Sequence, residues 1–416
     1  MDISNATQLA AARERAYSLP LEQFDVSEAS LFSSDTLWPY FERLRAEAPV
    51  HYCAESRFGP YWSLSRFEDI KRLDSDHLRF SSDRSVTIND DIEDFETPMF
   101  ISMDRPKHHE QRKVVSPAVA PRNLAKLEGT IRSRVGRILD ELPIDQPFNW
   151  VDEVSIELTT QMLATLFDFP FEERRRLTRW SDVASGGPRT GVVESREQRK
   201  EELLECLAVF TELWNERINK APGPDLISML AHGEATRKMP PMEYLGNVLL
   251  LIVGGNDTTR NSITGGVLAL NQFPDQYQKL RDQRSLIPNM VSEIIRWQTP
   301  VAHMRRTALE DVEIHGEQIR KGDKVVMWYV SGNRDPGEFE RPDELVIDRP
   351  NARHHLSFGY GVHRCMGNRL AEMQLRIVWE EILERFDRVE VVGQPVRITT
   401  NLLRAYSELP VRLHRK

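Results

Sequence analysis

The stretch FGYGVHRCMG, residues 358–367, contains one of only three cysteines in a sequence of 416 residues. Glycines lie four residues before Cys365 and two residues after it, and a histidine lies two residues before it. Such a thiol can be a buried structural cysteine, a catalytic nucleophile or a single metal ligand. The glycines disfavour the first reading, because they let the backbone turn sharply and approach a flat ligand without Cβ clashes.

The side chains before the cysteine indicate which chemistry this loop supports. His363 and Arg364 add hydrogen-bond donors and positive charge beside the sulfur, and turns of the loop can aim backbone N–H groups at it. Both effects stabilise a thiolate. A single thiolate held in this way is the axial ligand arrangement of haem iron.

The composition is that of a globular protein and argues against several function classes. With 40% apolar and 29% charged residues, the chain has enough apolar material for a substantial core. The net charge of −9, without a basic block, disfavours nucleic-acid binding. The N-terminus is too polar for a signal peptide or membrane anchor, and the longest strongly apolar run, 249–253, is far shorter than the roughly 20 residues that span a bilayer. We therefore expect a cytoplasmic protein.

Apolar periodicity predicts a mainly helical chain. Residues 1–36 read as an irregular N-terminal arm, and a single domain is expected over residues 37–416. A helix is predicted from Leu37 to the proline at 49, and residues 106–237 read as amphipathic helices broken at prolines and glycines.

Short β-like runs and one strong helix complete the pattern. The helix follows Cys365, and its shared apolar face comprises Leu375, Trp379, Ile382 and Phe386. The β-like runs are residues 50–53, 61–65, 312–314 and 324–330, of which the first two suggest a hairpin. The predicted fold class is mainly α with a minor β region.

The segment LLLIVGGNDTTRNS, residues 249–262, is too polar at its centre for an ordinary buried helix. Gly254 and Gly255 each cost a helix roughly 1 kcal/mol relative to alanine. They permit a local widening, in which a threonine hydroxyl bonds back to a freed carbonyl. A glycine pair that only packs two helices together is the alternative reading.

The loop Phe358-x-x-Gly361-x-His363-x-Cys365-x-Gly367 resembles the haem-binding loop of the cytochrome P-450 monooxygenases of the soluble bacterial type. The resemblance implies a single-domain cytochrome P-450 fold, with haem b between a distal long helix and the helix after the cysteine loop. It also implies Cys365 as the axial iron ligand, contacts from Phe358 and Gly367 to haem, and O2 as co-substrate.

Two further motifs match the same family. Asp257 and Thr258 match its acid–alcohol pair on the oxygen side of haem, where such groups relay protons from water. Glu293 and Arg296 alone would read as a surface ion pair. Together with Arg349 they match the family's structural triad beneath the haem loop.

Haem carries two propionates, which must be neutralised where they are buried. Arginine and histidine are the natural donors for them. By resemblance, His108 and Arg112 supply two such donors, and Arg306 and His363 supply two more.

Three functions compete for this constellation. A haem-thiolate monooxygenase uses every motif. A haem protein that only transfers electrons or senses a gas has no need of Asp257 and Thr258. A thiol hydrolase built on Cys365 and His363 lacks an evident orienting carboxylate.

The resemblance also implies the electron donors. Because the sequence ends soon after the helix that follows Cys365, we expect no fused flavin-binding reductase domain. An iron–sulfur ferredoxin and its NAD(P)H-dependent reductase are the implied partners, with no nucleic acid and no membrane anchor. The basic residues expected to steer an acidic partner are Arg112, Lys113, Arg364 and Arg369.

The substrate is predicted from the segments that line the family's pockets. Their residues are nearly all apolar, which suggests a channel for an alkyl chain, although several could simply pack the core. The residues of the two motifs around Asp257 and Cys365 resemble most those of bacterial alkane and fatty-acid terminal hydroxylases. This resemblance implies ω-hydroxylation of medium-chain alkanes or fatty acids. The alternative is regioselective hydroxylation of a compact terpenoid or aromatic. The pocket candidates are Ile88, Phe95, Met99, Phe100, Val183, Leu250, Leu251, Gly254, Val301, Met304, Leu402 and Leu403.

Overall fold

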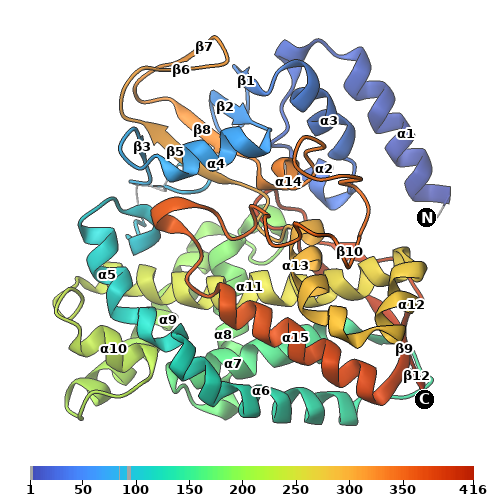
Figure 1. The fold of residues 1–416 in the computed structure, drawn as a ribbon. Helices are drawn as coiled ribbons and strands as arrows, with labels where there is room; N and C mark the ends of the chain where they lie inside the picture. Colours follow the sequence, from blue (N-terminus) through green and yellow to red (C-terminus); the bar gives the residue numbers. More distant parts are fainter. Residues whose placement is uncertain (1–2, 84, 91–94) are drawn as a thin grey trace. The chain divides into compact units, whose positions relative to one another are not determined.

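The computed structural model describes residues 3–83, 85–90 and 95–416, which divide into two compact units (Figure 1). The first unit comprises Met1–Asp91, Ala269–Cys365 and Val396–Ala405. The second comprises Ile92–Leu268, Met366–Pro395 and Tyr406–Lys416. Both units combine segments that are far apart in the sequence, so neither is a sequential domain.

The first unit is built on a five-stranded sheet in the order β1-β2-β8-β5-β3. β1 and β2 are antiparallel, β2 and β8 are parallel, and β5 is antiparallel to both β8 and β3. β6 and β7 form a separate hairpin. The strands are β1 (Val50–Cys53), β2 (Tyr61–Leu64), β3 (Phe80–Ser81), β5 (Met304–Ala308), β6 (Val312–Ile314), β7 (Glu317–Ile319), β8 (Lys324–Met327) and β10 (Val396–Arg397).

Helices pack on this sheet through apolar faces. Phe67 and Ile70 of α4 share a core cluster with Val325 and Met327 of β8, and burying such side chains stabilises the fold by roughly 1.5–3 kcal/mol each. The helices of the first unit are α1 (Ile3–Ser18), α2 (Ala29–Ser33), α3 (Trp38–Glu47), α4 (Phe67–Ser75), α12 (Pro274–Asp282), α13 (Ile287–Gln298) and α14 (Tyr329–Gly332).

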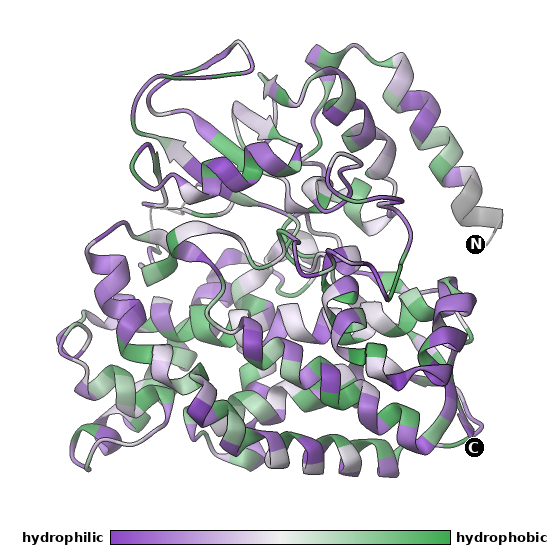
Figure 2. Ribbon diagram, viewed as in Figure 1, coloured by the Kyte–Doolittle hydropathy of each residue, from purple (hydrophilic) through white to green (hydrophobic). Residues whose placement is uncertain are grey.

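The second unit is mostly helical, and its amphipathic helices alternate hydrophobic and hydrophilic residues around their axes (Figure 2). A small sheet has the order β4-β12-β9. The elements are α5 (Lys107–Val115), α6 (Pro121–Glu141), α7 (Glu157–Phe167), α8 (Arg175–Ser185), α9 (Arg196–Ile218), α10 (Leu226–His232), α11 (Pro241–Gln272, assigned to this unit as far as Leu268), α15 (Asn368–Arg385), β4 (Phe148–Asn149), β9 (Phe386–Val391), β11 (Tyr406–Glu408) and β12 (Pro410–Arg415). Within the described residues, no helix is both long and apolar enough to cross a bilayer.

Ion pairs join α6 to α15, which lie side by side (Figure 1). Arg132 of α6 binds Glu381 at 2.7 Å, and Arg376 of α15 binds Glu128 at 2.7 Å. Because these side chains are partly exposed, each pair contributes little, and the buried apolar face of α15 holds the helix in place.

The predicted helices and strands are largely confirmed, with one clear correction. The prediction of an irregular arm over residues 1–36 is wrong for Ile3–Ser18, which form α1, and for Ala29–Ser33, which form α2. Met1 and Asp2 lie outside the described residues. Ala16 is fully buried, and Arg13 pairs with Glu42 of α3 at 2.6 Å, so tertiary packing stabilises an alanine-rich segment of high helix propensity.

Two element boundaries also differ from the prediction. The run predicted over 324–330 is a strand only to Met327 and then turns into α14. Phe386 begins β9 and is not part of the helix face of α15.

Candidate functional site

The cysteine loop packs its backbone directly against the end of α4. Gly359 and Gly361 both have φ of +65°, a left-handed conformation that glycine adopts at little cost. A Cβ on Gly361 would lie 2.6 Å from the carbonyl oxygen of Asp74, so no larger residue fits there. The backbone N–H of Cys365 donates to the carbonyl oxygen of Phe358 at 2.7 Å and closes the loop.

The three cysteines differ in burial. Cys53 and Cys206 are buried, whereas Cys365 is exposed. Burial raises the pKa of the Cys53 thiol to about 11, and it raises the pKa of Cys206 even further. Because the thiolate is the form that binds metals, Cys365 is the best suited of the three to be a ligand.

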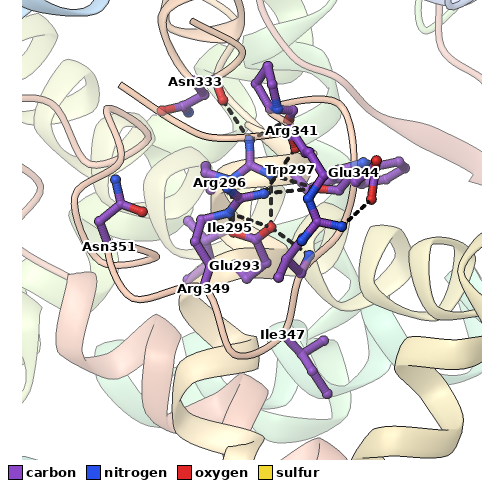
Figure 3. A network of polar contacts seen from close by, with 12 residues as sticks. Glu293, Ile295, Arg296, Trp297, Asn333, Arg341, Glu344, Ile347, Arg349 and Asn351 are labelled. Carbon is purple, nitrogen blue, oxygen red and sulfur yellow. Dashed lines mark hydrogen bonds and ion pairs between the residues drawn. The ribbon is translucent and has the colours of Figure 1, made fainter. Parts of the chain in front are cut away.

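Glu293, Arg296 and Arg349 form one buried network (Figure 3). The Glu293 carboxylate accepts from Nε and Nη2 of Arg296, at 2.8 Å each, and from Nε of Arg349 at 3.1 Å. Glu293 and Arg296 are both 0% exposed, which excludes the surface ion pair. The backbone N–H of Val346 donates to the same carboxylate at 2.9 Å.

This network continues to the start of the cysteine loop. Arg296 donates to the carbonyl oxygen of Asn333 at 2.7 Å. The Asn333 side chain donates to Ser357 Oγ at 2.9 Å and accepts the N–H of Leu356 at 2.7 Å. Ser357 Oγ donates back to the carbonyl oxygen of Ile295 on α13 at 2.8 Å. The triad therefore supports the chain immediately before the loop.

The glycine pair of α11 serves two different purposes. A Cβ on Gly255 would lie 2.8 Å from Leu163 of α7, so this glycine permits close helix packing. A Cβ on Gly254 would meet no heavy atom within 4 Å among the described residues. Thr258 Oγ1 donates to the carbonyl oxygen of Gly254 at 3.0 Å, which is the back-bond predicted for a threonine here. Leu251, Gly254 and Thr258 share a face of α11 that is not fully buried.

Asp257 points into a polar cluster inside the second unit. Its side chain is 0% exposed, and Oδ1 accepts from Ser181 Oγ at 3.1 Å and lies 3.1 Å from Nη2 of Arg260. The same nitrogen donates to Asp182 at 2.7 Å. Burial raises the pKa of Asp257 above its ordinary value; Arg260 opposes this shift and Asp182 adds to it. Oδ2 is buried without a hydrogen-bond partner in the described part of the chain. The Asp257 carboxyl group therefore keeps its proton to a higher pH than an ordinary aspartic acid does.

The four predicted propionate residues fall in both units. His108 is buried on α5, and Arg112 follows one helical turn later, half-buried. His363 is half-buried in the 3₁₀ turn Gly361–His363. Arg306 is buried on β5 and donates to Asp74 Oδ1 at 2.7 Å. Their common role toward haem remains a prediction.

The pocket candidates divide by burial. Those buried in core clusters are Ile88, Phe100 and Val183, and Leu403 is also buried, so these four contribute at least to packing. The remaining ones, which are half-buried or exposed, are Phe95, Met99, Leu250, Leu251, Gly254, Val301, Met304 and Leu402.

His303 joins two of the segments that carry pocket candidates. Its ring is 0% exposed; Nε2 accepts the backbone N–H of Ile88 at 3.3 Å, and Nδ1 therefore donates to the carbonyl oxygen of Asn401 at 3.1 Å. Burial lowers the pKa of His303 from 6.5 to about 4, so the neutral ring holds both segments at neutral pH.

We expect stability to fall in mild acid because of such histidines. Burial also lowers the pKa of His355, to about 3. Since the unfolded chain binds these protons near pH 6.5, the stabilisation is complete above that pH and is lost as the pH falls toward 4 and below, by about 3 kcal/mol for His303. Urea unfolding of the parent and of His303→Gln between pH 8 and 4 measures how the free energy of unfolding of each protein falls with pH. The variant should lose less stability over that interval, whereas the exposed control His315→Gln should follow the parent.

Several residues of the site were not predicted from the sequence. Arg260, three residues after Asp257, could have been found from helical spacing. Ser181, Asp182 and Asp74 could not, because only tertiary contacts bring them to their partners.

Comparisons with known proteins agree on one family. The family model described as cytochrome P-450 matches residues 152–406. The chain is 35% identical to linalool 8-monooxygenase of Pseudomonas putida, over 94% of this chain and 99% of that protein. It is 30% identical to a methyl-branched lipid omega-hydroxylase of Mycobacterium tuberculosis, over 89% and 90% of the two chains. The solved structure of cytochrome P-450-153 from Novosphingobium aromaticivorans matches with a TM-score of 0.88 and 47% identity, over 94% of this chain and 99% of that one.

Proposed function

This chain belongs to the cytochrome P-450 family, and we propose that it hydroxylates the terminal methyl group of medium-chain alkanes or fatty acids. Members of the family are monooxygenases that use haem b and O2, and the fold of this chain is theirs, predominantly helical with minor sheet. The observation that carries the terminal position is the similarity to an omega-hydroxylase over most of both chains.

Cys365 is the residue that would hold the haem iron in this proposal. Cys365 is the exposed cysteine, and it follows the sharp turns at Gly359 and Gly361. Burial raises the pKa of the other two thiols, which keeps them protonated. Haem held by this sulfur would supply the O2-activating chemistry that a monooxygenase needs. The exposed sulfur and the glycine turns of its loop fit this group, and we assign its propionates to His108, Arg112, Arg306 and His363. Phe358 and Gly367 complete the contacts to it in this proposal.

Asp257 and Thr258 are the proposed proton carriers. Asp257 has a raised pKa and a buried oxygen available for a proton, while the Thr258 hydroxyl lies on the incompletely buried face of the same helix. Reduction of O2 to water and a hydroxylated product consumes two protons, so a carboxyl and a hydroxyl in succession provide the relay.

We expect Asp257→Asn to slow turnover by about 100-fold, because general acid catalysis of this kind is typically worth 10²–10⁴. Haem content should not change, since the variant removes a proton carrier and not a ligand. Steady-state rates and the absorbance of bound haem measure both quantities. An unchanged rate would remove Asp257 from the mechanism.

Thr258→Ala should uncouple the reaction, so that reducing equivalents yield peroxide in place of alcohol. The variant lacks the hydroxyl proposed to deliver the proton and its bond to the Gly254 carbonyl oxygen, while the bond from the Asn261 side chain to the Asp257 carbonyl oxygen remains. The ratio of product to NAD(P)H consumed measures coupling. Thr258→Ser retains the hydroxyl and should restore it; equal uncoupling in both variants would contradict the role.

Bacterial members of this family normally receive electrons from redox partners. We assign this role to an iron–sulfur ferredoxin with an NAD(P)H-dependent reductase, and we place the reaction in the cytoplasm. The proposed steering charges are Arg112, Lys113, Arg364 and Arg369, so ferredoxin-dependent reduction should slow as salt rises. Arg112 is half-buried and is also assigned to a propionate, so the other three carry most of this effect.

The proposed substrate channel is apolar and selects the chain end. A methyl C–H bond is stronger than those of the neighbouring methylene groups. The shape of the channel must therefore place the methyl group at the reaction site, although the methylene groups react more easily. Leu251 and Gly254 beside Thr258 are suited to this, because the open side of Gly254 leaves room for a narrow chain. Each methylene buried adds roughly 0.8 kcal/mol of binding.

A reconstituted assay on octane, dodecanoic acid and a monoterpene tests the proposal, with product positions read by mass spectrometry. We expect primary alcohols from the two linear substrates. Mainly subterminal alcohols would contradict the terminal position.

The second candidate is regioselective hydroxylation of a compact terpenoid or aromatic. It is favoured by the 35% identity to linalool 8-monooxygenase over nearly the whole of both chains. Turnover of the monoterpene alone in the same assay would establish this candidate in place of the first.

A further inference from the structure

Three hydrogen-bond donors from three separate parts of the first unit converge on the carboxylate of Asp74. This residue lies near the end of α4 and is 3% exposed. Oδ2 accepts the backbone N–H of Tyr360 at 2.7 Å and the hydroxyl of Tyr329 at 2.9 Å. Oδ1 accepts Nη2 of Arg306 at 2.7 Å. One buried carboxylate thus joins the cysteine loop, α14 and β5.

The position of this acid opposes helix electrostatics. The C-terminal end of a helix carries partial negative charge, which disfavours a carboxylate there. A buried carboxylate is also costly unless it is paired and hydrogen-bonded. Arg306, itself 3% exposed, compensates the charge at Oδ1, and the other two donors hydrogen-bond Oδ2. The contacts of Asp74 therefore compensate a position that is otherwise unfavourable for a carboxylate.

The glycines on either side of Tyr360 are fitted to the same residue. A Cβ on Gly359 would lie 3.1 Å from Asp74 Oδ2, and a Cβ on Gly361 would lie 2.6 Å from the Asp74 carbonyl oxygen. The backbone of the cysteine loop therefore lies in direct contact with Asp74, a few residues before Cys365.

We propose that Asp74 is the positioning residue of the cysteine loop: it anchors the loop backbone at Tyr360 and balances the charge of Arg306. The inference rests on the proposed function only in that Cys365 is taken as the haem ligand. Loss of Asp74 releases the loop and removes the carboxylate that pairs with Arg306, so the net charge beside the loop becomes more positive by one unit. Added positive charge favours the reduced state of nearby iron, so the midpoint potential should rise.

The test compares the parent, Asp74→Ala and a control, Asp69→Ala, in the haem-loaded protein. Asp69 lies on the same helix and bonds His315 near the surface. In Asp74→Ala, hydrogen exchange of the amides of residues 358–364 should quicken by about tenfold, the factor expected for one lost hydrogen bond. The share of the reduced carbonyl complex without the thiolate-type band should rise, and so should the midpoint potential. Asp69→Ala should match the parent in all three measurements.

A second variant separates the anchoring of the loop backbone from the charge balance with Arg306. It also tests the proposal if Asp74→Ala does not fold. Asp74→Asn keeps an oxygen for the Tyr360 N–H but cannot balance Arg306. Its loop exchange should stay near the parent's while its midpoint potential rises. Parental exchange in Asp74→Ala, or a parental potential in Asp74→Asn, overturns the proposal. Should Cys365→Ala retain the thiolate-type band while exchange responds as expected, the ligand assignment fails and the loop anchor stands.

Discussion

Cys365→Ala should abolish the thiolate-type spectrum of the reduced carbonyl complex and lower monooxygenation by at least about 1,000-fold, as expected when a group on which the whole catalytic unit depends is lost. Some haem can remain bound through its other contacts. The physical reason is that alanine offers no sulfur, and neither remaining thiol ionises readily, because burial raises the pKa of both.

The matched controls are Cys53→Ser and Cys206→Ser. Each removes a thiol from a buried position, so each is expected to cost some stability and to leave the carbonyl spectrum unchanged. Retention of the thiolate-type band in Cys365→Ala, together with its loss in either control, would move the ligand to that other cysteine. Absorbance of the reduced carbonyl complex for the three variants decides between them.

Glu293→Ala should lower the free energy of unfolding by at least about 3–5 kcal/mol, the cost of breaking a buried ion pair and leaving a charge behind. Two guanidinium groups, those of Arg296 and Arg349, lose their shared counter-charge inside the first unit. Since whole proteins are stable by only about 5–15 kcal/mol, much of the variant should fail to fold or to retain haem.

The chain offers a matched control for this variant in the same network (Figure 3). Glu344 pairs with Arg341 at 3.0 Å, with both side chains about half exposed, so Glu344→Ala should change stability by less than about 1 kcal/mol. Urea unfolding of both variants measures the difference. A stable Glu293→Ala protein that binds haem but does not turn over would make Glu293 catalytic, contrary to the structural role proposed for it.

What could be read from the sequence was local. The helix of α3, the hairpin of β1 and β2 and the apolar face of α15 all follow from residues within a few positions of one another. The turns at Gly359 and Gly361 and the back-bond from Thr258 to Gly254 also lie within one loop or one helical turn. Such features depend on backbone sterics and short-range hydrogen bonds, which neighbouring residues specify almost alone.

What only the tertiary structure decided depends on burial and on partners distant in sequence. The sequence could not tell whether Glu293 was a surface charge or a buried one, because its second arginine and its backbone donor lie more than fifty residues away. The raised pKa of Asp257 arises from the packing of α8 against α11, and the role of Asp74 arises from a loop and a strand that follow hundreds of residues later. The N-terminal helix is stabilised by contacts with α3 and not by its own propensity alone. The energy of a charge depends on how much water surrounds it, and the folded chain determines that quantity.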